Sequence, residues 1–443
     1  MKKQLTALLL ALIFSILLVP AQAGAEGEAY ALTVTVNGEQ KLIRAYDESY
    51  EGNLFLSLTD LASALSGTEK RFCFERIISS TDGEYFVVTM GQMPVLGSGA
   101  GGMSANGAPV VLNLFRNRLV LDGEDRKYYT YNPQNGDLFM SLIDVQLMLD
   151  MTFEKNGDML IAKPNQHFVP DVRVLRDEGY FDGINSVYLA DANTGEAFFL
   201  WNGYNALPVA SISKLLSYYV LKEAIDAGEI RYSDMVRISE NAQKLSQSQD
   251  GIVPMEAGAH VPLRELMEAM LIASSNEAAV ALAEHLCGSE ETFVERMNAR
   301  ARELGLFSVE MYNCNGLPSY SGGNIPFKRQ NCMSAADLFL LIQMILQRYP
   351  EITEITSAKL GHMPSLNDYW TANSNPLVYN MEGVTGLKTG STNRAGYCLA
   401  ATLPVERSGE THDLVLILLG AETGEIRGQA SEILLRYARA TVQ

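Results

Sequence analysis

The stretch that decides the fold is residues 207–216, LPVASISKLL, in which Ser211 and Lys214 stand three positions apart. Apolar residues follow at helical spacing as far as Ile225, and Gly228 is a stop signal, so a buried helix is predicted. Residues three apart share a helix face, which puts the Lys214 amine beside the Ser211 hydroxyl. A desolvated lysine there would be a base beside a nucleophile. The alternative interpretation is that Ser211 only caps the helix and Lys214 is exposed to solvent. A Ser-x-x-Lys pattern is weak evidence by itself, because roughly one or two occur by chance in a chain of this length.

The length of 443 residues suits two or three domains, and the formal net charge of -18 argues against a nucleic-acid partner. Residues 1–23 have the pattern of a secretory signal peptide. Lys2 and Lys3 precede an apolar run, and the small residues Ala21 and Ala23 form a cleavage site. We therefore expect export to the cell envelope or beyond. The alternative is an uncleaved anchor, the one case in which membrane contact is expected, but the run is short for a span.

Five cysteines are present, and an odd number leaves at least one thiol free or paired with another chain. Cys314 and Cys332 flank a loop rich in Gly, Ser and Pro, which makes them the favoured pair if a disulfide forms. Neither the cysteines nor the five histidines have the spacing of a metal site, so no metal and no cofactor is expected.

Residues 27–163 are predicted to form a separate small α+β module, joined by a linker at 164–184 to a second domain at 185–443. The sequence NLFLSLTDL at 53–61 is echoed by DLFMSLIDV at 137–145, each predicting a strand end, a cap and a short helix. The module resembles the stalk modules named after the N-terminal domain of copper amine oxidases. Copper is not implied, because the module has no histidine cluster.

The second domain is predicted to place strands at both of its ends and helices between them. This order indicates an α/β fold of the α+β type, with an antiparallel sheet and a helical lobe. Residues 237–259 are expected to be irregular and residues 261–273 to form one helix. Ser289 and Ser334 are expected to cap two further helices. The predicted strands are 186–191, 196–201, 396–404 and 413–421.

Three short polar motifs follow one another in this domain. They are Ser211-Ile212-Ser213-Lys214, Ser274-Ser275-Asn276 and Lys388-Thr389-Gly390. We expect Ser211 to attack a peptide carbonyl and form an acyl-enzyme while Lys214 takes its proton. The Ser274 hydroxyl can relay a proton to the leaving amine. The backbone N–H groups of Ser211 and Ser391 are candidates for an oxyanion hole.

The remaining motif residues suit substrate binding. Asn276 can bind a backbone amide of the substrate and hold the head of Lys214. Lys388 and Thr389 can bind a terminal carboxylate, and Gly390 would let the backbone come close to the ligand. The charge of Lys388 is also expected to lower the pKa of Lys214. Each motif taken alone is equally compatible with a cap or a turn, and it is their ordered combination that points to catalysis.

The three motifs together are those of penicillin-binding proteins and class A β-lactamases. From residue 185 onward the chain resembles the serine D-alanyl-D-alanine carboxypeptidases, the low-molecular-mass penicillin-binding proteins. Further segments that carry the resemblance are 191–195, 271–283, 315–317, 334–338, 386–392 and 395–397. The resemblance implies a β-lactamase/transpeptidase-like fold. It also implies removal of the terminal D-alanine from peptidoglycan stem peptides, with β-lactam antibiotics as inhibitors.

The chain departs from the family pattern in places. Ser275 stands where the family often has glycine, and the loop at 319–329 looks longer than usual. No C-terminal β-domain or amphipathic anchor is recognised, so the resemblance does not imply the family's usual mode of membrane attachment.

Other functions remain open alternatives. A class A β-lactamase needs a Glu-x-x-x-Asn pattern between the second and third motifs, and no Glu from 277 to 382 has Asn four residues on. A non-catalytic penicillin or peptidoglycan sensor is a second alternative. An adhesive or structural role of the N-terminal module is a third.

Overall fold

The computed structural model describes most of the chain, and its contacts divide it into two compact units, Met1–Phe168 and Val169–Gln443. The predicted signal peptide and most of the 319–329 loop lie outside the described residues. The described residues are 25–27, 30–48, 53–79, 83–92, 110–112, 114–121, 124–131, 138–177, 179–318 and 329–442.

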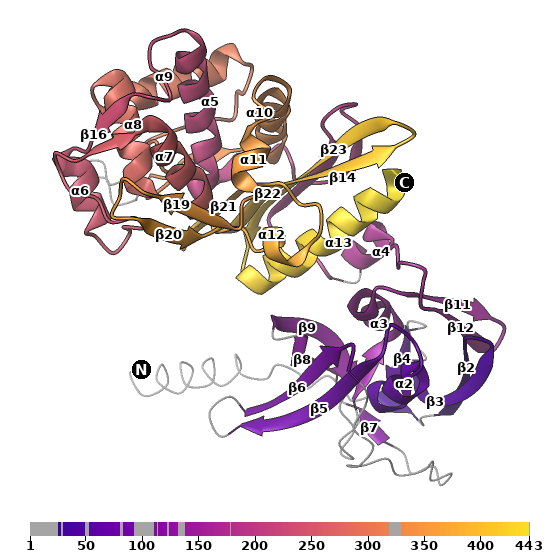
Figure 1. Ribbon diagram of the computed structural model, residues 1–443. Helices are drawn as coiled ribbons and strands as arrows, with labels where there is room; N and C mark the ends of the chain where they lie inside the picture. Colours follow the sequence, from indigo (N-terminus) through magenta and orange to yellow (C-terminus); the bar gives the residue numbers. More distant parts are fainter. Residues whose placement is uncertain are drawn as a thin grey trace, which may run out of the picture. The chain divides into compact units, whose positions relative to one another are not determined.

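The first unit is built on a ten-stranded sheet with the order β11-β12-β2-β3-β4-β10-β9-β8-β6-β5 (Figure 1). Its β2–β3 hairpin turns at Asn37 and Gly38, both at positive φ, which suits the twist of the two strands. The strands are β2 Tyr30–Val36, β3 Glu39–Glu48, β4 Asn53–Ser57, β5 Phe72–Ser79, β6 Gly83–Met90, β8 Leu114–Leu121, β9 Glu124–Tyr131, β10 Phe139–Ser141, β11 Thr152–Asn156 and β12 Met159–Lys163. A separate pair joins β1 Ala25–Gly27 and β7 Val110–Leu112.

The two copies of the predicted repeat form the same local structure. β4 leads into helix α2 (Leu58–Leu65), and β10 leads into helix α3 (Leu142–Leu149). In each copy a serine caps the helix, with Ser57 Oγ accepting from the N–H of Asp60 and Ser141 Oγ from that of Asp144. β4 and β10 pair antiparallel with each other. The repeats therefore meet at the middle of the sheet, and the apolar faces of both helices enter one core.

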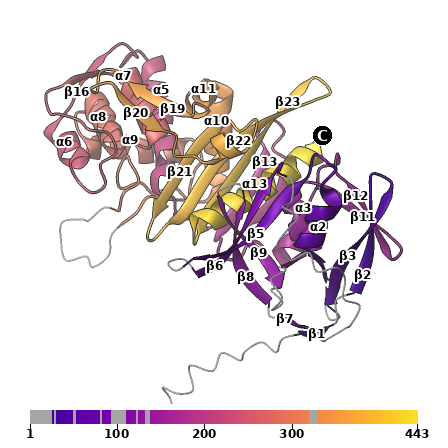
Figure 2. The same cartoon turned by 60° about the horizontal axis from the view of Figure 1, so that its bottom comes forward.

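The second unit contains a five-stranded antiparallel sheet, which confirms the predicted fold class. Its strand order is β14-β13-β23-β22-β21, so the first and last parts of the unit meet in one sheet (Figure 2). The strands are β13 Ser186–Asp191, β14 Ala197–Trp201, β21 Gly386–Thr392, β22 Gly396–Arg407 and β23 Glu410–Ala421. β13, at the start of the unit, pairs with β23 near its end, closing the domain across more than two hundred residues.

Both faces of this sheet are buried. Successive residues of a strand point to opposite faces. Val415, Ile417 and Leu419 belong to the core shared with the helical lobe. The intervening Leu414 and Leu416 are fully buried on the other face, where the C-terminal helix α13 (Gly424–Val442) packs on β22 and β23.

The helical lobe packs around α5 and α8 on the first face of the sheet (Figure 1). Its helices are α5 Lys214–Asp226, α6 Glu240–Ser246, α7 Leu263–Glu268, α8 Asn276–Cys287, α9 Glu290–Glu303, α10 Ala335–Arg348 and α11 Ile352–Thr356. Shorter helices are α4 Val172–Asp177, α12 Leu377–Asn380, the 3-10 helix η1 Ala210–Ser213 and the π-helix η2 Ala269–Ala273. Three two-stranded sheets join β15 Leu207–Pro208 with β18 Cys332–Met333, β16 Met235–Arg237 with β17 His260–Pro262, and β19 Leu360–Met363 with β20 Tyr369–Ala372. None of the helices in the described part of the chain is both long and apolar enough to cross a membrane.

Two local predictions were wrong. Residues 237–259 contain the helix α6, which Ser239 caps by accepting from the N–H of Ala242. Its apolar signal is weak, because Ala242 is its one fully buried residue. The predicted helix at 261–273 is interrupted: Val261 lies in β17, and the last turns widen into η2. The caps at Ser289 and Ser334 and the stop at Gly228 are present as predicted.

Candidate active site

Ser211 and Lys214 lie where the 3-10 helix η1 passes into α5. Lys214 Nζ is 2.9 Å from Ser211 Oγ, as the three-residue spacing predicted. Ser211 is not the cap of a long helix, since α5 begins only at Lys214. Ala210, just before it, has φ 49, a conformation costly for a residue with a side chain. The turn is therefore held in an unusual shape by its surroundings.

Lys214 is fully buried among oxygen atoms. Besides Ser211 Oγ, its Nζ contacts Asn276 Oδ1 at 2.8 Å and the carbonyl oxygen of Asn315 at 2.6 Å. Burial lowers the pKa of Lys214 to about 7, and the electrostatic effects of Cys314 and Glu277 only partly oppose it. Near neutral pH this amine can therefore accept a proton.

The second motif joins η2 to α8. Ser274 ends η2 in a left-handed conformation with φ 64. Ser275 caps α8, its Oγ accepting from the N–H of Ala278 at 3.0 Å, so the residue that departs from the family pattern has a structural role. Asn276 begins α8 and contacts Lys214. In the described part of the chain, no hydrogen bond joins Ser274 to Ser211 or Lys214.

The third motif lies in β21, whose residues pack beside η1. Lys388 is 1% exposed, and its Nζ donates to the carbonyl oxygen of Thr389 at 2.9 Å. Burial lowers the pKa of Lys388 well below its usual range, and the charges of Lys214 and Arg427 lower it further. Burial, and not the charge of Lys388, is the main cause that lowers the pKa of Lys214.

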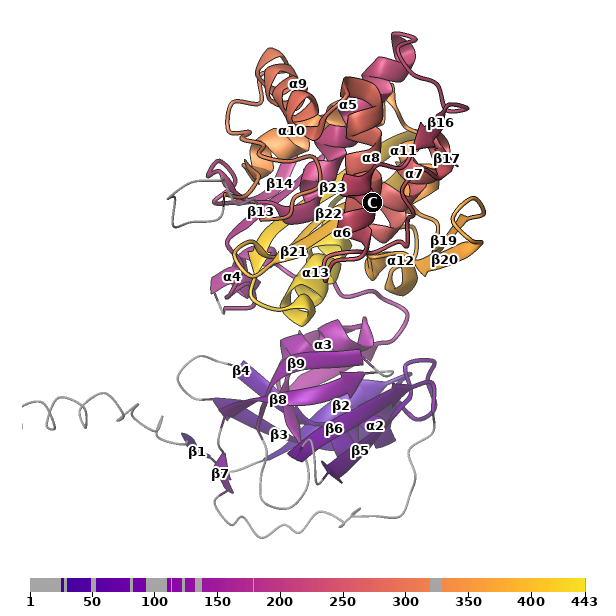
Figure 3. The same cartoon turned by 90° about the vertical axis from the view of Figure 1, so that its left-hand side faces the viewer.

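Thr389 has a partner that the sequence did not indicate. Its Oγ1 lies 3.0 Å from Ser374 Oγ. The N–H of Ser374 donates to the carbonyl oxygen of Ile272 in η2 at 3.0 Å, so Ser374 links the third motif to the helix that precedes the second. Ser374 stands two residues after the β19–β20 hairpin, which lies beside α7 (Figure 3). No spacing pattern marks Ser374, because its role depends on where the hairpin ends.

Gly390 also packs closely against the protein itself. A Cβ atom there would come within 2.8 Å of the carbonyl oxygen of Val209 and 2.9 Å of the nitrogen of Ser211. At Gly316 it would lie 2.1 Å from the carbonyl oxygen of Ala210. Gly390 and Gly316 thus both lie in close contact with the backbone around Ser211. This contact leaves no room for a side chain at either position.

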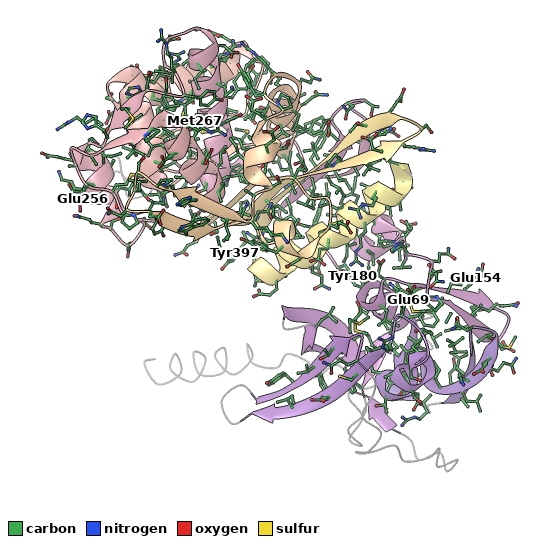
Figure 4. The ribbon with its side chains drawn as sticks, in the orientation of Figure 1. Glu69, Glu154, Tyr180, Glu256, Met267 and Tyr397 are labelled. Carbon is green, nitrogen blue, oxygen red and sulfur yellow. The ribbon has the colours of Figure 1, made fainter. Side chains whose placement is uncertain are left out.

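Ser391 follows Gly390 in β21 and is exposed. It lies opposite Tyr397 of β22, which is labelled in Figure 4 and is 40% exposed. The Arg427 guanidinium carbon of α13 lies 5.8 Å from the centre of the Tyr397 ring. Arg427 was also not predicted from the sequence. It reaches the Tyr397 ring only because α13 packs behind β22.

Cys314 and Cys332, the pair favoured if a disulfide forms, are not joined, since all five cysteines are free. The sulfur of Cys314 lies 3.1 Å from Glu290 Oε1, whereas that of Cys332 contacts the carbonyl oxygen of Gln330 at 3.3 Å. The two side chains therefore have separate environments. Flanking the same loop did not bring them together, because Cys314 is buried in the core of the helical lobe.

Comparison with known proteins relates the second unit to one family. Residues 184–423 match the family described as D-alanyl-D-alanine carboxypeptidase (peptidase S11). The D-alanyl-D-alanine carboxypeptidase DacF of Bacillus subtilis is 32% identical over 255 residues, which cover 57% of this chain and 61% of the relative. DacC of Escherichia coli is 29% identical over 253 residues, covering 56% and 59%. The chain thus spans about three fifths of the length of these curated relatives.

Solved structures give the same relationship. Penicillin binding protein 5 from Haemophilus influenzae has 28% sequence identity and a TM-score of 0.52, covering 58% of this chain and 71% of that chain. Penicillin binding protein 6B from Escherichia coli has 28% identity and a TM-score of 0.51, covering 58% and 77%. Because the family match includes more than half of the chain and all three motifs, this protein belongs to the D-alanyl-D-alanine carboxypeptidase family.

Proposed function

We propose that the protein is an exported serine-type D-Ala-D-Ala carboxypeptidase, which removes the terminal D-alanine from peptidoglycan stem peptides in the cell envelope. The observation that carries the proposal is the contact between Lys214 Nζ and Ser211 Oγ at 2.9 Å, with the amine buried and its pKa at about 7. A nucleophile beside a base of matched pKa is the arrangement that acyl transfer needs. Membership of the family supports the choice of substrate.

In the proposed reaction Lys214 takes the Ser211 proton as Oγ bonds to the carbonyl carbon between the two D-alanines. The N–H groups of Ser211 and Ser391 stabilise the oxyanion. The C–N bond then breaks, and the departing amine receives a proton from the Lys214 ammonium through the Ser274 hydroxyl. Water hydrolyses the ester at Ser211, which releases the shortened peptide and regenerates the enzyme.

Asn276, Lys388 and Thr389 bind substrate in this proposal. The hydroxyl of Thr389 and the ammonium group of Lys388 recognise the carboxylate of the last D-alanine. A carboxylate brings a negative charge to the buried amine of Lys388 and so favours its protonated form. Penicillins carry a carboxylate and a reactive amide, and we expect them to acylate Ser211 and to be released slowly.

The test is intact-mass analysis and D-alanine release with diacetyl-Lys-D-Ala-D-Ala and benzylpenicillin, on wild type and Ser211→Ala. A lasting penicillin adduct and D-alanine release by wild type alone support the proposal. Rapid penicillin turnover without D-alanine release would indicate a β-lactamase instead. The absence of both would leave a non-catalytic binding protein. Mass analysis of the protein secreted by its host tests the predicted cleavage after Ala23.

A further inference from the structure

Glu277 follows Asn276 in α8 and is 0% exposed, although charged side chains are almost never fully buried without a partner of opposite charge. Its Oε1 accepts hydrogen bonds from the backbone N–H groups of Ile252, at 3.1 Å, and of Val253. Its Oε2 is buried without a hydrogen-bond partner, and no salt bridge reaches Glu277 in the described part of the chain. A carboxylate in this position calls for an explanation.

The residue before it binds the same loop. Asn276 Nδ2 donates to the carbonyl oxygen of Asp250 at 2.9 Å, two residues before Ile252. Consecutive side chains of α8 therefore hold residues 250–253 at three points. The other end of the Asn276 amide, Oδ1, accepts from Lys214 Nζ at 2.8 Å. Because the amide is planar, its contact with Asp250 fixes the direction in which Oδ1 points.

Glu277 also acts on Lys214 through its charge. The polar and charged groups around the amine are Ser211 of η1, Asn276 and Glu277 of α8, Lys388 of β21 and the segment containing Cys314. Burial lowers the pKa of Lys214, and the electrostatic effects of Cys314, which is the larger, and of Glu277 oppose it. Cys314 is itself a buried thiol whose pKa is raised well above its usual range, so it stays neutral near pH 7. This leaves Glu277 as the anionic group that favours the protonated amine.

We infer that Glu277 is a positioning residue of this site: it holds the loop that aims Asn276 at Lys214, and its charge compensates in part for the burial of the amine. The inference rests on the proposed function for the reaction in which Lys214 takes part. Such a residue is useful because a base of very low pKa accepts a proton only weakly, whereas a base of high pKa is already protonated near neutral pH. Glu277 keeps the amine between these limits.

The test compares Glu277→Gln with Glu284→Gln in the full chain. Gln at 277 keeps an oxygen for the loop N–H groups but removes the charge. Glu284 is a matched control on the same helix: its Oε1 accepts from Asn241 Nδ2 at 3.0 Å, and its Oε2 is also buried without a partner. In Glu277→Gln the acid limb of benzylpenicillin acylation should move to lower pH by about one unit. In Glu284→Gln it should stay in place.

A second substitution tests the loop. Glu277→Ala removes the oxygen that accepts from the N–H groups of Ile252 and Val253. The loop that orients the Asn276 side chain is then no longer held at these two residues. The plateau rate constant of acylation should fall by roughly 10- to 100-fold. Glu277→Gln should lose much less, which separates the effect of geometry from that of charge. Equal losses in the two variants would contradict the inference.

One measurement does not depend on the reaction. NMR titration of protein labelled with ¹³C at lysine Cε reports the pKa of Lys214, whose signal is identified by its loss in Lys214→Arg. The midpoint should be lower in Glu277→Gln than in wild type and unchanged in Glu284→Gln. Identical midpoints in all three proteins overturn the inference even if the enzyme is active. A wild type that forms no adduct and releases no D-alanine overturns the proposed function, while the titration still decides the role of Glu277.

Discussion

Gly390 lies against the backbone of Ser211 so closely that a Cβ atom at residue 390 would be 2.9 Å from the Ser211 nitrogen. The atoms around this position belong mainly to the backbone of residues 209–211, which cannot rotate away as a side chain can. The third motif is thus part of the support that positions the nucleophile, in addition to its proposed role in substrate binding.

Substitution Gly390→Ala should therefore displace β21 from η1. We expect benzylpenicillin acylation to fall by about 100-fold or more, because a shift of this size misplaces the nucleophile. The rate of adduct formation, followed by mass spectrometry, measures the loss. Gly428→Ala is the control. A Cβ there meets nothing within 4 Å, and alanine in a helix interior should raise stability by about 0.5–1 kcal/mol without changing the rate.

The pKa of Lys214 at about 7 predicts how acylation depends on pH. Below this pKa the amine is protonated and cannot accept the Ser211 proton, and above it the amine is neutral. The rate constant should therefore rise about tenfold per pH unit between pH 5 and 7 and level off above pH 8. Rapid-quench measurements of adduct formation test this. A rate that is constant from pH 5 to 7 would show that Lys214 is not the base.

Ser374 should affect substrate binding through Thr389. Removing its hydroxyl in Ser374→Ala leaves Thr389 Oγ1 with the longer contact, at 3.3 Å, to the carbonyl oxygen of residue 374, and so holds it less firmly toward the proposed carboxylate position. We expect KM for diacetyl-Lys-D-Ala-D-Ala to rise several-fold, in line with one lost hydrogen bond of about 1 kcal/mol, with little change in kcat.

Ser365→Ala is the matched control, since the hydroxyl of Ser365 in the β19–β20 hairpin contacts Glu265 Oε1 at 2.8 Å instead. If the two variants have the same KM as wild type, Ser374 does not orient Thr389.

The cysteines should all be reduced thiols. Alkylation of unreduced, denatured protein with iodoacetamide should add five groups, and prior reduction should add no more. Native protein should react first at the partly exposed Cys287 and Cys332. Cys314 and Cys398 should react slowly, because burial hinders access and raises the pKa of both thiols, that of Cys398 to about 11. Three groups before reduction and five after it would show one disulfide, for which Cys314 and Cys332 are the pair that the sequence favours.

Sequence reasoning was most successful where the signal is local. The Ser211–Lys214 contact follows from the geometry of one helical turn, and the capping serines at 289 and 334 follow from hydrogen bonding within four residues. The stalk role of the first unit and the catalytic roles of the motif residues stay predictions. The helix α6 was missed because its apolar stripe is short.

By itself, the sequence determined the α+β class, most of the helix caps and the three motifs, because periodicity, caps and motif spacing are properties of neighbouring residues. The tertiary structure alone decided which distant groups meet: Asn315 with Lys214, Ser374 with Thr389, and Gly390 with the Ser211 backbone. It also decided that Cys314 and Cys332 stay apart. These contacts depend on packing between elements far apart in the chain, and so does the burial that lowers the pKa of Lys214, which no local pattern encodes.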